Sequence, residues 1–152
     1  MIKILFVCHG NICRSPMAEF VMKDLVASQH IEHKFVIDSA ATSTEEIGNP
    51  IHRGTRRVLV REGIPFGDHR ARQVARDEYT DWDLLVCMDE ENVRMLKRRF
   101  DGDPDRKIVK LLSYAGSNDD VADPWYTGDF DTTYKDVLRG CVGLLCEVVE
   151  KR

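Results

Sequence analysis

The stretch Ile2–Pro16, IKILFVCHGNICRSP, changes character halfway along. Its first six residues, up to Val7, are almost wholly apolar, which is typical of a short buried strand. Two cysteines, a histidine, an asparagine and an arginine follow within the next seven residues. Ser15 and Pro16 suit the N-cap and the first turn of a helix. The sequence therefore predicts a loop of reactive side chains between a strand and a helix.

The rest of the chain alternates between these two kinds of pattern. We predict four helices. They cover Met17–Ala27, the segment that starts at Asn49-Pro50 and ends at Gly63, a segment that follows Asp89 as its N-cap, and about Thr132–Val149. Further strands are predicted at Phe35–Ile37, Leu84–Met88 and Ile108–Leu112. Gly140 and Gly143 weaken the last helix and are expected to allow close packing. Strands that alternate with helices favour a parallel sheet covered on both faces, and ligands of such sheets bind beyond the carboxyl ends of the strands.

Length and composition indicate one ordinary domain. The chain has 152 residues, of which 43% are hydrophobic and 32% charged. No apolar run approaches the roughly 20 residues that span a bilayer, and we interpret MIKILFV as a strand rather than a signal peptide. The net charge of −4 gives no general affinity for nucleic acid. We therefore expect a single domain over residues 1–152, with no nucleic-acid partner and no membrane insertion.

The chain has five cysteines, an odd number without a secretion signal, which indicates a reducing compartment. We therefore expect a cytoplasmic protein. Cys8 and Cys13 have no second Cys/His pair of suitable spacing, so no metal and no cofactor are expected. Cys87 lies on a predicted strand, and Cys141 and Cys146 lie in the last predicted helix. These three are interpreted as packing residues.

Residues Cys8 to Arg14 spell Cys-x5-Arg and are followed by Ser15. The backbone N–H groups of a tight loop that enters a helix form a cradle for an anion. The guanidinium of Arg14 can grip two oxygens of a phosphate, and the same donors would favour a thiolate at Cys8. A nucleophilic sulfur at the base of a phosphate cradle predicts attack on phosphorus and a phosphocysteine intermediate.

Loss of a phenolate or alkoxide needs a proton donor, and Asp123 is our candidate. Pro124 follows it, and Trp125 and Tyr126 come next. Aromatic shielding and a nearby bound dianion would favour the protonated carboxyl. Alone, an Asp-Pro pair is an ordinary turn. Together with the Cys-x5-Arg-Ser motif, it is interpreted as the general acid.

Five motifs occur in a family-specific order between Val7 and Trp125: VCHGNICRSP, DSAAT, DHRARQ, LLVCMDEEN and DPW. In this order they resemble the low-molecular-weight protein tyrosine phosphatases. The resemblance implies an α/β fold, a single-domain three-layer sandwich in which a four-stranded parallel sheet has helices on both faces. It also implies hydrolysis of phosphotyrosine and small aryl phosphates, with phosphotyrosine-containing proteins as partners and inorganic phosphate as product and inhibitor.

The resemblance also assigns roles to single residues. Cys8 would be the nucleophile, Arg14 the phosphate clamp, and Asp123 the general acid and later the base for the hydrolytic water. Ser15 would donate a hydrogen bond to the Cys8 thiolate and assist its departure. Asn11 would hold the strained loop backbone. The other residues implied in phosphate binding and its support are His9, Gly10, Ile12, Cys13, Ser39 and His69, the last two as partners of Asn11.

Cys13 has two interpretations. It packs beneath the loop as a small apolar residue, or its thiol captures an oxidised Cys8 as a disulfide. The resemblance points to a reversible Cys8–Cys13 bridge.

The cleft wall departs from the family pattern. Family members often carry an aromatic residue shortly after the DSAAT strand, whereas this chain has Glu45 near that place. We therefore expect Trp125 and Tyr126 to form the apolar wall on the other side, and Glu45 to face an incoming substrate.

Three alternatives remain. A thiol-linked arsenate reductase of this fold needs two further cysteines to relay a disulfide, and Cys87 stands alone in its region. A protein-arginine phosphatase typically has threonine where this chain has Ile12, and isoleucine fits a phenyl ring better than a guanidinium. A non-catalytic phosphoprotein-binding module can dispense with Cys8 or Asp123, and both are present. The balance favours a tyrosine phosphatase.

Overall fold

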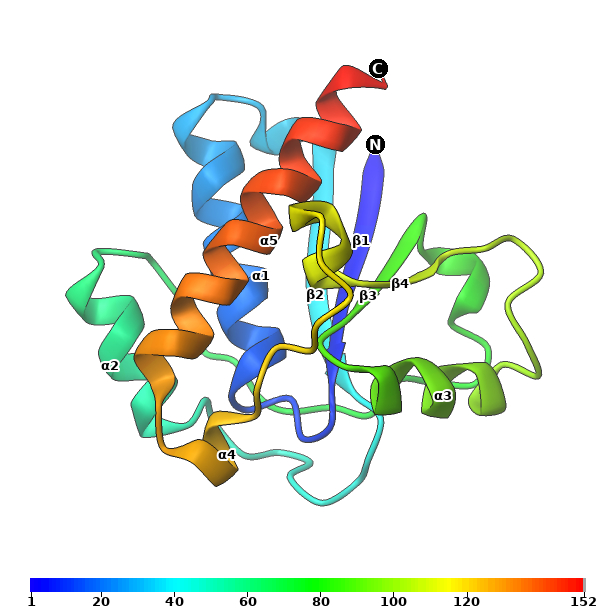
Figure 1. Cartoon of the computed structure of the whole chain (residues 1–152), viewed down its shortest axis with the longest axis horizontal. Helices are drawn as coiled ribbons and strands as arrows, with labels where there is room; N and C mark the ends of the chain where they lie inside the picture. The colour runs from blue at the N-terminus through cyan, green and yellow to red at the C-terminus, as the bar shows by residue number, and fades with distance from the viewer. Residues whose placement is uncertain (152) are drawn as a thin grey trace.

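Four parallel strands form the centre of the molecule in a computed structural model that describes residues 1–151 (Figure 1). The strands are β1 (Ile2–Cys8), β2 (Phe35–Ala41), β3 (Leu84–Cys87) and β4 (Ile108–Lys110), in the spatial order β2-β1-β3-β4. Residue Ile4 of β1 pairs with Ile37 on one side and with Leu84 on the other. The strand that precedes the Cys-x5-Arg loop is therefore held between two neighbours.

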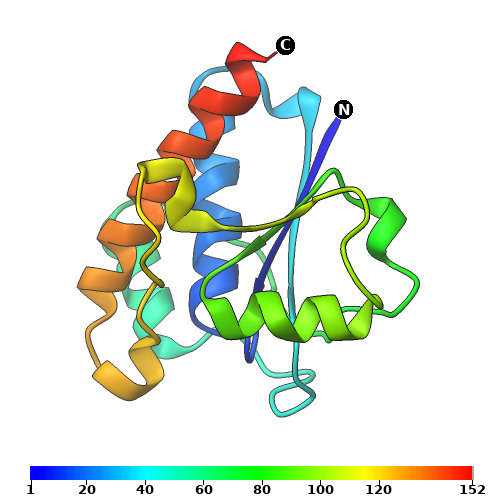
Figure 2. The same cartoon turned by 45° about the vertical axis from the view of Figure 1, so that its right-hand side comes forward.

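Helices cover both faces of this sheet (Figures 1 and 2). They are α1 (Arg14–Ser28), α2 (Arg53–Arg61), α3 (Glu90–Arg99), α4 (Pro124–Thr127) and α5 (Phe130–Glu150), with 3-10 helices η1 (Glu32–Lys34), η2 (Tyr79–Asp81) and η3 (Leu111–Ala115). Helices α1, α2 and α5 lie on one side, and α3 lies on the other. The predicted α/β three-layer sandwich with a four-stranded parallel sheet is confirmed.

Alternate residues of β1 supply the two cores. Phe6 is fully buried in the core that contains Met17 of α1 and Leu144 of α5. Val7 is fully buried in the opposite core, with Leu96 of α3. A strand that is covered on both faces has no polar side, which explains why Ile2–Val7 reads as an almost unbroken apolar run.

The two glycines of α5 lie where other elements approach it closely. A Cβ atom at Gly140 would overlap the side chain of Leu111, and one at Gly143 would overlap the backbone carbonyl of Tyr114. Both partners belong to η3. The prediction that these glycines allow close packing is confirmed.

Several element boundaries differ from the sequence prediction. Helix α1 begins at Arg14, with Cys13 at the N-cap position, so the prediction of Ser15 as N-cap was wrong. Helix α2 begins at Arg53 rather than at Asn49, and His52 caps it by accepting a hydrogen bond from Gly54 N. Ser15 does not cap α1 because its hydroxyl is engaged with Cys8 and Asn11.

The predicted cap of α3 is confirmed. Asp89 Oδ1 accepts a hydrogen bond from Asn92 N at 2.8 Å, and Asn92 Oδ1 accepts one from Asp89 N at 3.1 Å. Such a reciprocal pair satisfies N–H groups that a helix start leaves without partners. This leaves Asp89 Oδ2 free to face another element.

The carboxyl ends of the strands gather at one end of the molecule, at the bottom in Figure 1. The loop after β1, the start of α2 and the short helix α4 lie at this end. Within residues 1–151, none of the helices combines the length and the apolar character that crossing a membrane requires.

Candidate active site

The loop after β1 folds around the sulfur of Cys8. The backbone N–H groups of Asn11 and Ser15 donate to Cys8 Sγ at 3.2 and 3.4 Å, and Ser15 Oγ lies 3.0 Å from the same atom. Three hydrogen-bonding groups therefore surround one sulfur, two of them backbone N–H donors. The sulfur of Cys8 thus lies at the base of the loop, where these groups converge.

Asn11 holds this loop in an unusual backbone conformation. Its φ of 61° lies in the left-handed region, which Asn tolerates better than most residues. Its buried side chain donates to Ser15 Oγ at 2.8 Å and to Ser39 Oγ at 3.0 Å, and accepts a hydrogen bond from Arg72 N at 3.1 Å. Because Ser15 Oγ accepts from Asn11, its own hydrogen is available for Cys8.

His69 and Glu19 support the loop from behind. His69 Nε2 lies 2.8 Å from the backbone oxygen of Asn11, and its Nδ1 lies 4.0 Å from Glu19 Oε1. The same Glu19 oxygen accepts a hydrogen bond from Ser39 Oγ at 2.6 Å. Sequence analysis missed Glu19, which is only 4% exposed. A carboxylate within an apolar helix segment was the available signal.

Arg14 is buried and held at both ends of its guanidinium. Nη1 donates to Asp89 Oδ2 and to the backbone oxygen of Val121, both at 2.8 Å, and Nη2 lies 3.5 Å from Asp123 Oδ2. Burial disfavours its charge, but Cys8, Asp89 and Asp123 outweigh burial and raise the pKa of Arg14. Asp89 therefore holds the guanidinium of Arg14 in place, whereas the sequence predicted it only as a helix cap.

Asp123 forms the N-cap of α4. Its Oδ1 accepts a hydrogen bond from Trp125 N at 3.0 Å. The preceding residues are anchored too, because Val121 N donates to Met88 O at 2.8 Å and Thr133 Oγ1 donates to Ala122 O at 3.2 Å. The carboxyl is thus held at the mouth of the loop, and its side chain is 25% exposed.

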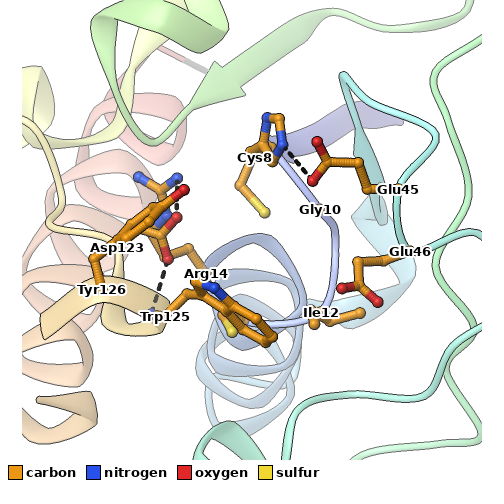
Figure 3. Close-up of a pocket in the computed structure, with 11 residues that line it drawn as sticks. Cys8, Gly10, Ile12, Arg14, Glu45, Glu46, Asp123, Trp125 and Tyr126 are labelled. Atoms are coloured by element: carbon orange, nitrogen blue, oxygen red, sulfur yellow. Dashed lines mark hydrogen bonds and ion pairs between the residues drawn. The ribbon is translucent and has the colours of Figure 1, made fainter. Parts of the chain in front are cut away.

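A cavity of about 110 Å³ joins these groups (Figure 3). Its lining contains ten of the residues that the sequence predicted, namely Cys8, His9, Gly10, Ile12, Cys13, Arg14, Glu45, Asp123, Trp125 and Tyr126. The four other predicted residues, Asn11, Ser15, Ser39 and His69, form the hydrogen-bonded support described above. Glu46 also lines the cavity and was missed.

The two walls of the cavity differ in chemistry. Trp125 and Tyr126 form one side and are 58% and 84% exposed. Glu45 and Glu46 lie opposite them in Figure 3. Glu45 Oε2 lies 3.0 Å from His9 Nε2, so this carboxylate has a partner at the rim. One wall is aromatic and the other acidic.

The cysteines fall into distinct environments. Burial, and after it the charge of Cys8, raises the pKa of the Cys13 thiol. Cys87 and Cys141 are fully buried. Cys146 is exposed, so its interpretation as a packing residue was wrong, because it lies on the outer face of α5. Among residues 1–151, no three His, Cys, Asp or Glu side chains are grouped so that they could hold a metal ion.

Known proteins resemble this chain over its whole length. The family model described as low molecular weight phosphotyrosine protein phosphatase matches residues 3–152. The low molecular weight protein-tyrosine-phosphatase YfkJ of Bacillus subtilis is 42% identical over 154 aligned residues, which cover 100% of this chain and 99% of YfkJ. The low molecular weight phosphotyrosine protein phosphatase of Homo sapiens is 41% identical, with coverage of 93% and 92%.

Solved structures agree with these sequence relationships. The crystal structure of YfkJ superimposes with a TM-score of 0.96 and covers 100% of this chain and 97% of its own. A drosophila arginine phosphatase, DARP, superimposes with a TM-score of 0.88 at 28% identity and covers 97% and 98%. Since a family model and relatives above 40% identity both span nearly the entire chain, the chain belongs to the family of low molecular weight phosphotyrosine protein phosphatases.

Proposed function

We propose that this protein is a cysteine-dependent tyrosine phosphatase that hydrolyses phosphotyrosine in proteins, as well as small aryl phosphates. One observation carries the proposal. Cys8 Sγ receives donors from Asn11 N, Ser15 N and the Ser15 hydroxyl, at the base of a cavity that also contains Arg14 and Asp123. This is an activated nucleophile, an anion clamp and an acid in one site.

In the first step, the Cys8 thiolate attacks phosphorus and forms the S–P bond while the bond from phosphorus to the phenolic oxygen breaks. Asp123 gives its proton to the departing phenolate. Arg14 and the loop N–H groups stabilise the charge on the phosphoryl oxygens. Asp89 and the Val121 carbonyl already hold the guanidinium in place, so little reorganisation is needed.

In the second step, Asp123 accepts a proton from a water molecule that attacks phosphorus, and the S–P bond breaks. The hydrogen bonds to Cys8 Sγ, including that of Ser15, stabilise the thiolate as it leaves. Inorganic phosphate is the product. We expect it to inhibit as well, because the same cradle binds it.

The cavity favours a phenyl ring over the competing substrates. Ile12 lines it with an apolar side chain, and Trp125 and Tyr126 form the aromatic wall. The likeness to an arginine phosphatase extends to the fold, but Ile12 offers no hydrogen bond to a guanidinium. Arsenate reduction needs a relay of accessible thiols, and Cys87 is fully buried in the sheet.

The working environment follows from the same chemistry. A thiolate nucleophile must stay reduced, so we infer that the protein works in a reducing, cytoplasmic compartment on phosphotyrosine-containing proteins. We also infer that residues 1–152 act as one domain without a metal or other cofactor.

Replacement of the nucleophile tests the proposal. Cys8→Ser should lose essentially all turnover of p-nitrophenyl phosphate, because an alcohol at this position is far less ionised than a thiol, and it should still bind vanadate or phosphate. The wild type should show a burst of p-nitrophenolate under rapid mixing. Cys146→Ser is the matched control, since Cys146 is exposed and should be dispensable. Substantial turnover by Cys8→Ser would refute the mechanism.

A further inference from the structure

A second hollow adjoins the cavity of the proposed active site. It measures about 510 Å³ and is lined by the start of α2 and by residues of α4 and its flanks. Trp125 lines both spaces and so lies where they meet. When a phosphotyrosine occupies the first cavity, a neighbouring side chain of the same peptide is within reach of the second hollow beside Trp125.

Packed rings form the base of this hollow. The ring of His52 stacks on Phe130, with centroids 4.9 Å apart, and meets Trp125 edge-on at 5.7 Å. Gly54 permits this arrangement, because a Cβ atom there would collide with Phe130. The contacts tie the start of α2 to α4 and α5, so the hollow is part of the packed structure.

Two arginines give the hollow its charge. Arg53 and Arg57 are exposed, one helical turn apart, and both line the hollow. Within residues 1–151 neither of them forms a salt bridge or a side-chain hydrogen bond. The neighbouring carboxylates have other partners, because Asp131 is bound by Arg61 and Glu46 accepts a hydrogen bond from Asn49.

His52 lines the hollow but contributes no charge to it at neutral pH. Burial, and after it the charge of Arg53, lowers the pKa of His52. Its Nδ1 accepts a hydrogen bond from Gly54 N at 2.9 Å, which requires that nitrogen to be unprotonated. The positive potential of the hollow therefore comes from Arg53 and Arg57, in a chain whose net charge is −4.

We propose that Arg53 and Arg57 form a subsite for an aspartate or glutamate side chain close to the phosphotyrosine of a substrate peptide. The inference rests on the proposed tyrosine phosphatase function. It adds a preference for an acidic residue on one side of the phosphotyrosine. Glu45 lines the first cavity opposite Tyr126, so the two flanks of the cleft carry opposite charge. An acidic residue should therefore help on one side of the phosphotyrosine only.

A panel of phosphotyrosine peptides of one sequence measures this preference. Each peptide carries glutamate at one flanking position, and its matched partner carries glutamine there. On one side of the phosphotyrosine, the wild type should show a kcat/KM for glutamate about three- to fivefold above that for glutamine, the upper part of the range for an exposed charge pair. The preference should shrink between about 0.02 M and about 0.5 M salt because of screening.

Variants of the two arginines test whether the preference for glutamate comes from the hollow. In the double variant Arg53→Gln/Arg57→Gln the ratio of glutamate to glutamine peptide should fall to about one. Arg56→Gln is the matched control, because it removes the same charge from the same helix while its guanidinium lies over Phe66, 5.9 Å from the ring centroid. An unchanged ratio in the double variant, or an equal fall in Arg56→Gln, would overturn the proposal.

A binding measurement separates this inference from the proposed function. Dissociation constants of the same peptide pairs are measured on the Cys8→Ser background, where turnover is not needed. Failure of the wild type to hydrolyse p-nitrophenyl phosphate refutes the phosphatase function alone. Equal affinities for the glutamate and glutamine peptides at every position refute the subsite alone, and tighter binding of the glutamate peptide that depends on Arg53 and Arg57 supports it.

Discussion

The loop Cys8–Ser15 and the segment 121–126 face each other across one cavity but are built in opposite ways. Asn11 and Ser15 are fully buried, and the side chain of Asn11 forms three hydrogen bonds. The opposing segment is anchored at Val121 and buries Pro124, and it ends in Trp125 and Tyr126, which are 58% and 84% exposed. A buried, hydrogen-bonded loop thus faces a segment in which Asp123 is half-buried and the two aromatic residues that follow Pro124 are exposed.

The difference matches the roles that we propose for the two parts. A phosphoryl group has one shape in every substrate, so its donors can be fixed in advance. Leaving groups differ in size and basicity, and the acid must also reach water in the second step. We therefore expect changes in the loop to affect all substrates alike, and changes at Asp123 to depend on the leaving group.

The largest effect of a conservative change should come from Arg14→Lys. Lysine offers a point charge and cannot bond Asp89, Val121 and two phosphoryl oxygens as the planar guanidinium can. We expect kcat/KM to fall by about 10³-fold, near the upper end for loss of a preorganised donor. The fall should be equal for phenyl phosphate and p-nitrophenyl phosphate. Arg139→Lys, on the exposed face of α5, is the control, and a loss that varies with the leaving group would contradict a rigid cradle.

Asp123→Asn should show the opposite behaviour. Asparagine preserves the hydrogen bond with Trp125 N but has no proton to donate as an acid. For phenyl phosphate we expect a loss on the order of 10²-fold, within the range of general acids. For p-nitrophenyl phosphate, whose leaving group needs little protonation, the loss should be much smaller, as steady-state kinetics over a leaving-group series would reveal.

Asp120 is the other carboxyl that could supply this proton. Burial opposes its charge, but the hydrogen bonds from Lys110 and from Glu90 N, together with the charges of Lys110 and Arg14, outweigh burial and lower the pKa of Asp120, so it is ionised at neutral pH. Asp120→Asn should therefore leave the leaving-group dependence intact. Equal losses across the series in Asp123→Asn would mean that another residue is the acid.

Replacement of Cys13 tests whether this residue protects the proposed nucleophile, Cys8, from irreversible oxidation. Peroxide converts the Cys8 thiolate to a sulfenic acid, and condensation with the Cys13 thiol would release water and form a disulfide. Because burial raises the pKa of Cys13, this closure should accelerate as the pH rises. The wild type should recover activity with dithiothreitol, and Cys13→Ser should recover several-fold less.

The control for this experiment is Cys146→Ser, whose recovery should equal that of the wild type. Mass spectrometry of the oxidised protein gives the decisive measurement. If it finds no Cys8–Cys13 linkage, Cys13 serves only to pack beneath the loop.

The smallest effect should come from Glu45→Gln on the acidic wall. Its carboxylate is 69% exposed and paired with His9, so its charge is worth at most about 1 kcal/mol to a basic substrate residue. Peptides with lysine beside the phosphotyrosine should lose no more than about fivefold in kcat/KM. Glu91→Gln, on α3, is the control. An unchanged preference for lysine would remove Glu45 from substrate selection.

Local pattern determined much of this protein. The apolar run Ile2–Val7, the alternation of strands with helices and the cap at Asp89 are short-range signals, because burial on both faces and helix geometry leave a direct trace in neighbouring residues. The Cys-x5-Arg spacing is short-range too, since one loop must hold both groups. These features were predicted correctly.

Only the tertiary structure decided which partners support the site. Asp89, Glu19 and Glu46 reach it from three separate elements, and Ser15 turns to Cys8 instead of capping its helix. His52, which caps α2, is stacked on Phe130, far along the chain. Such contacts depend on how distant segments approach in space. The local pattern of residues does not predict these contacts, because segments with the same short pattern can pack against many different neighbours.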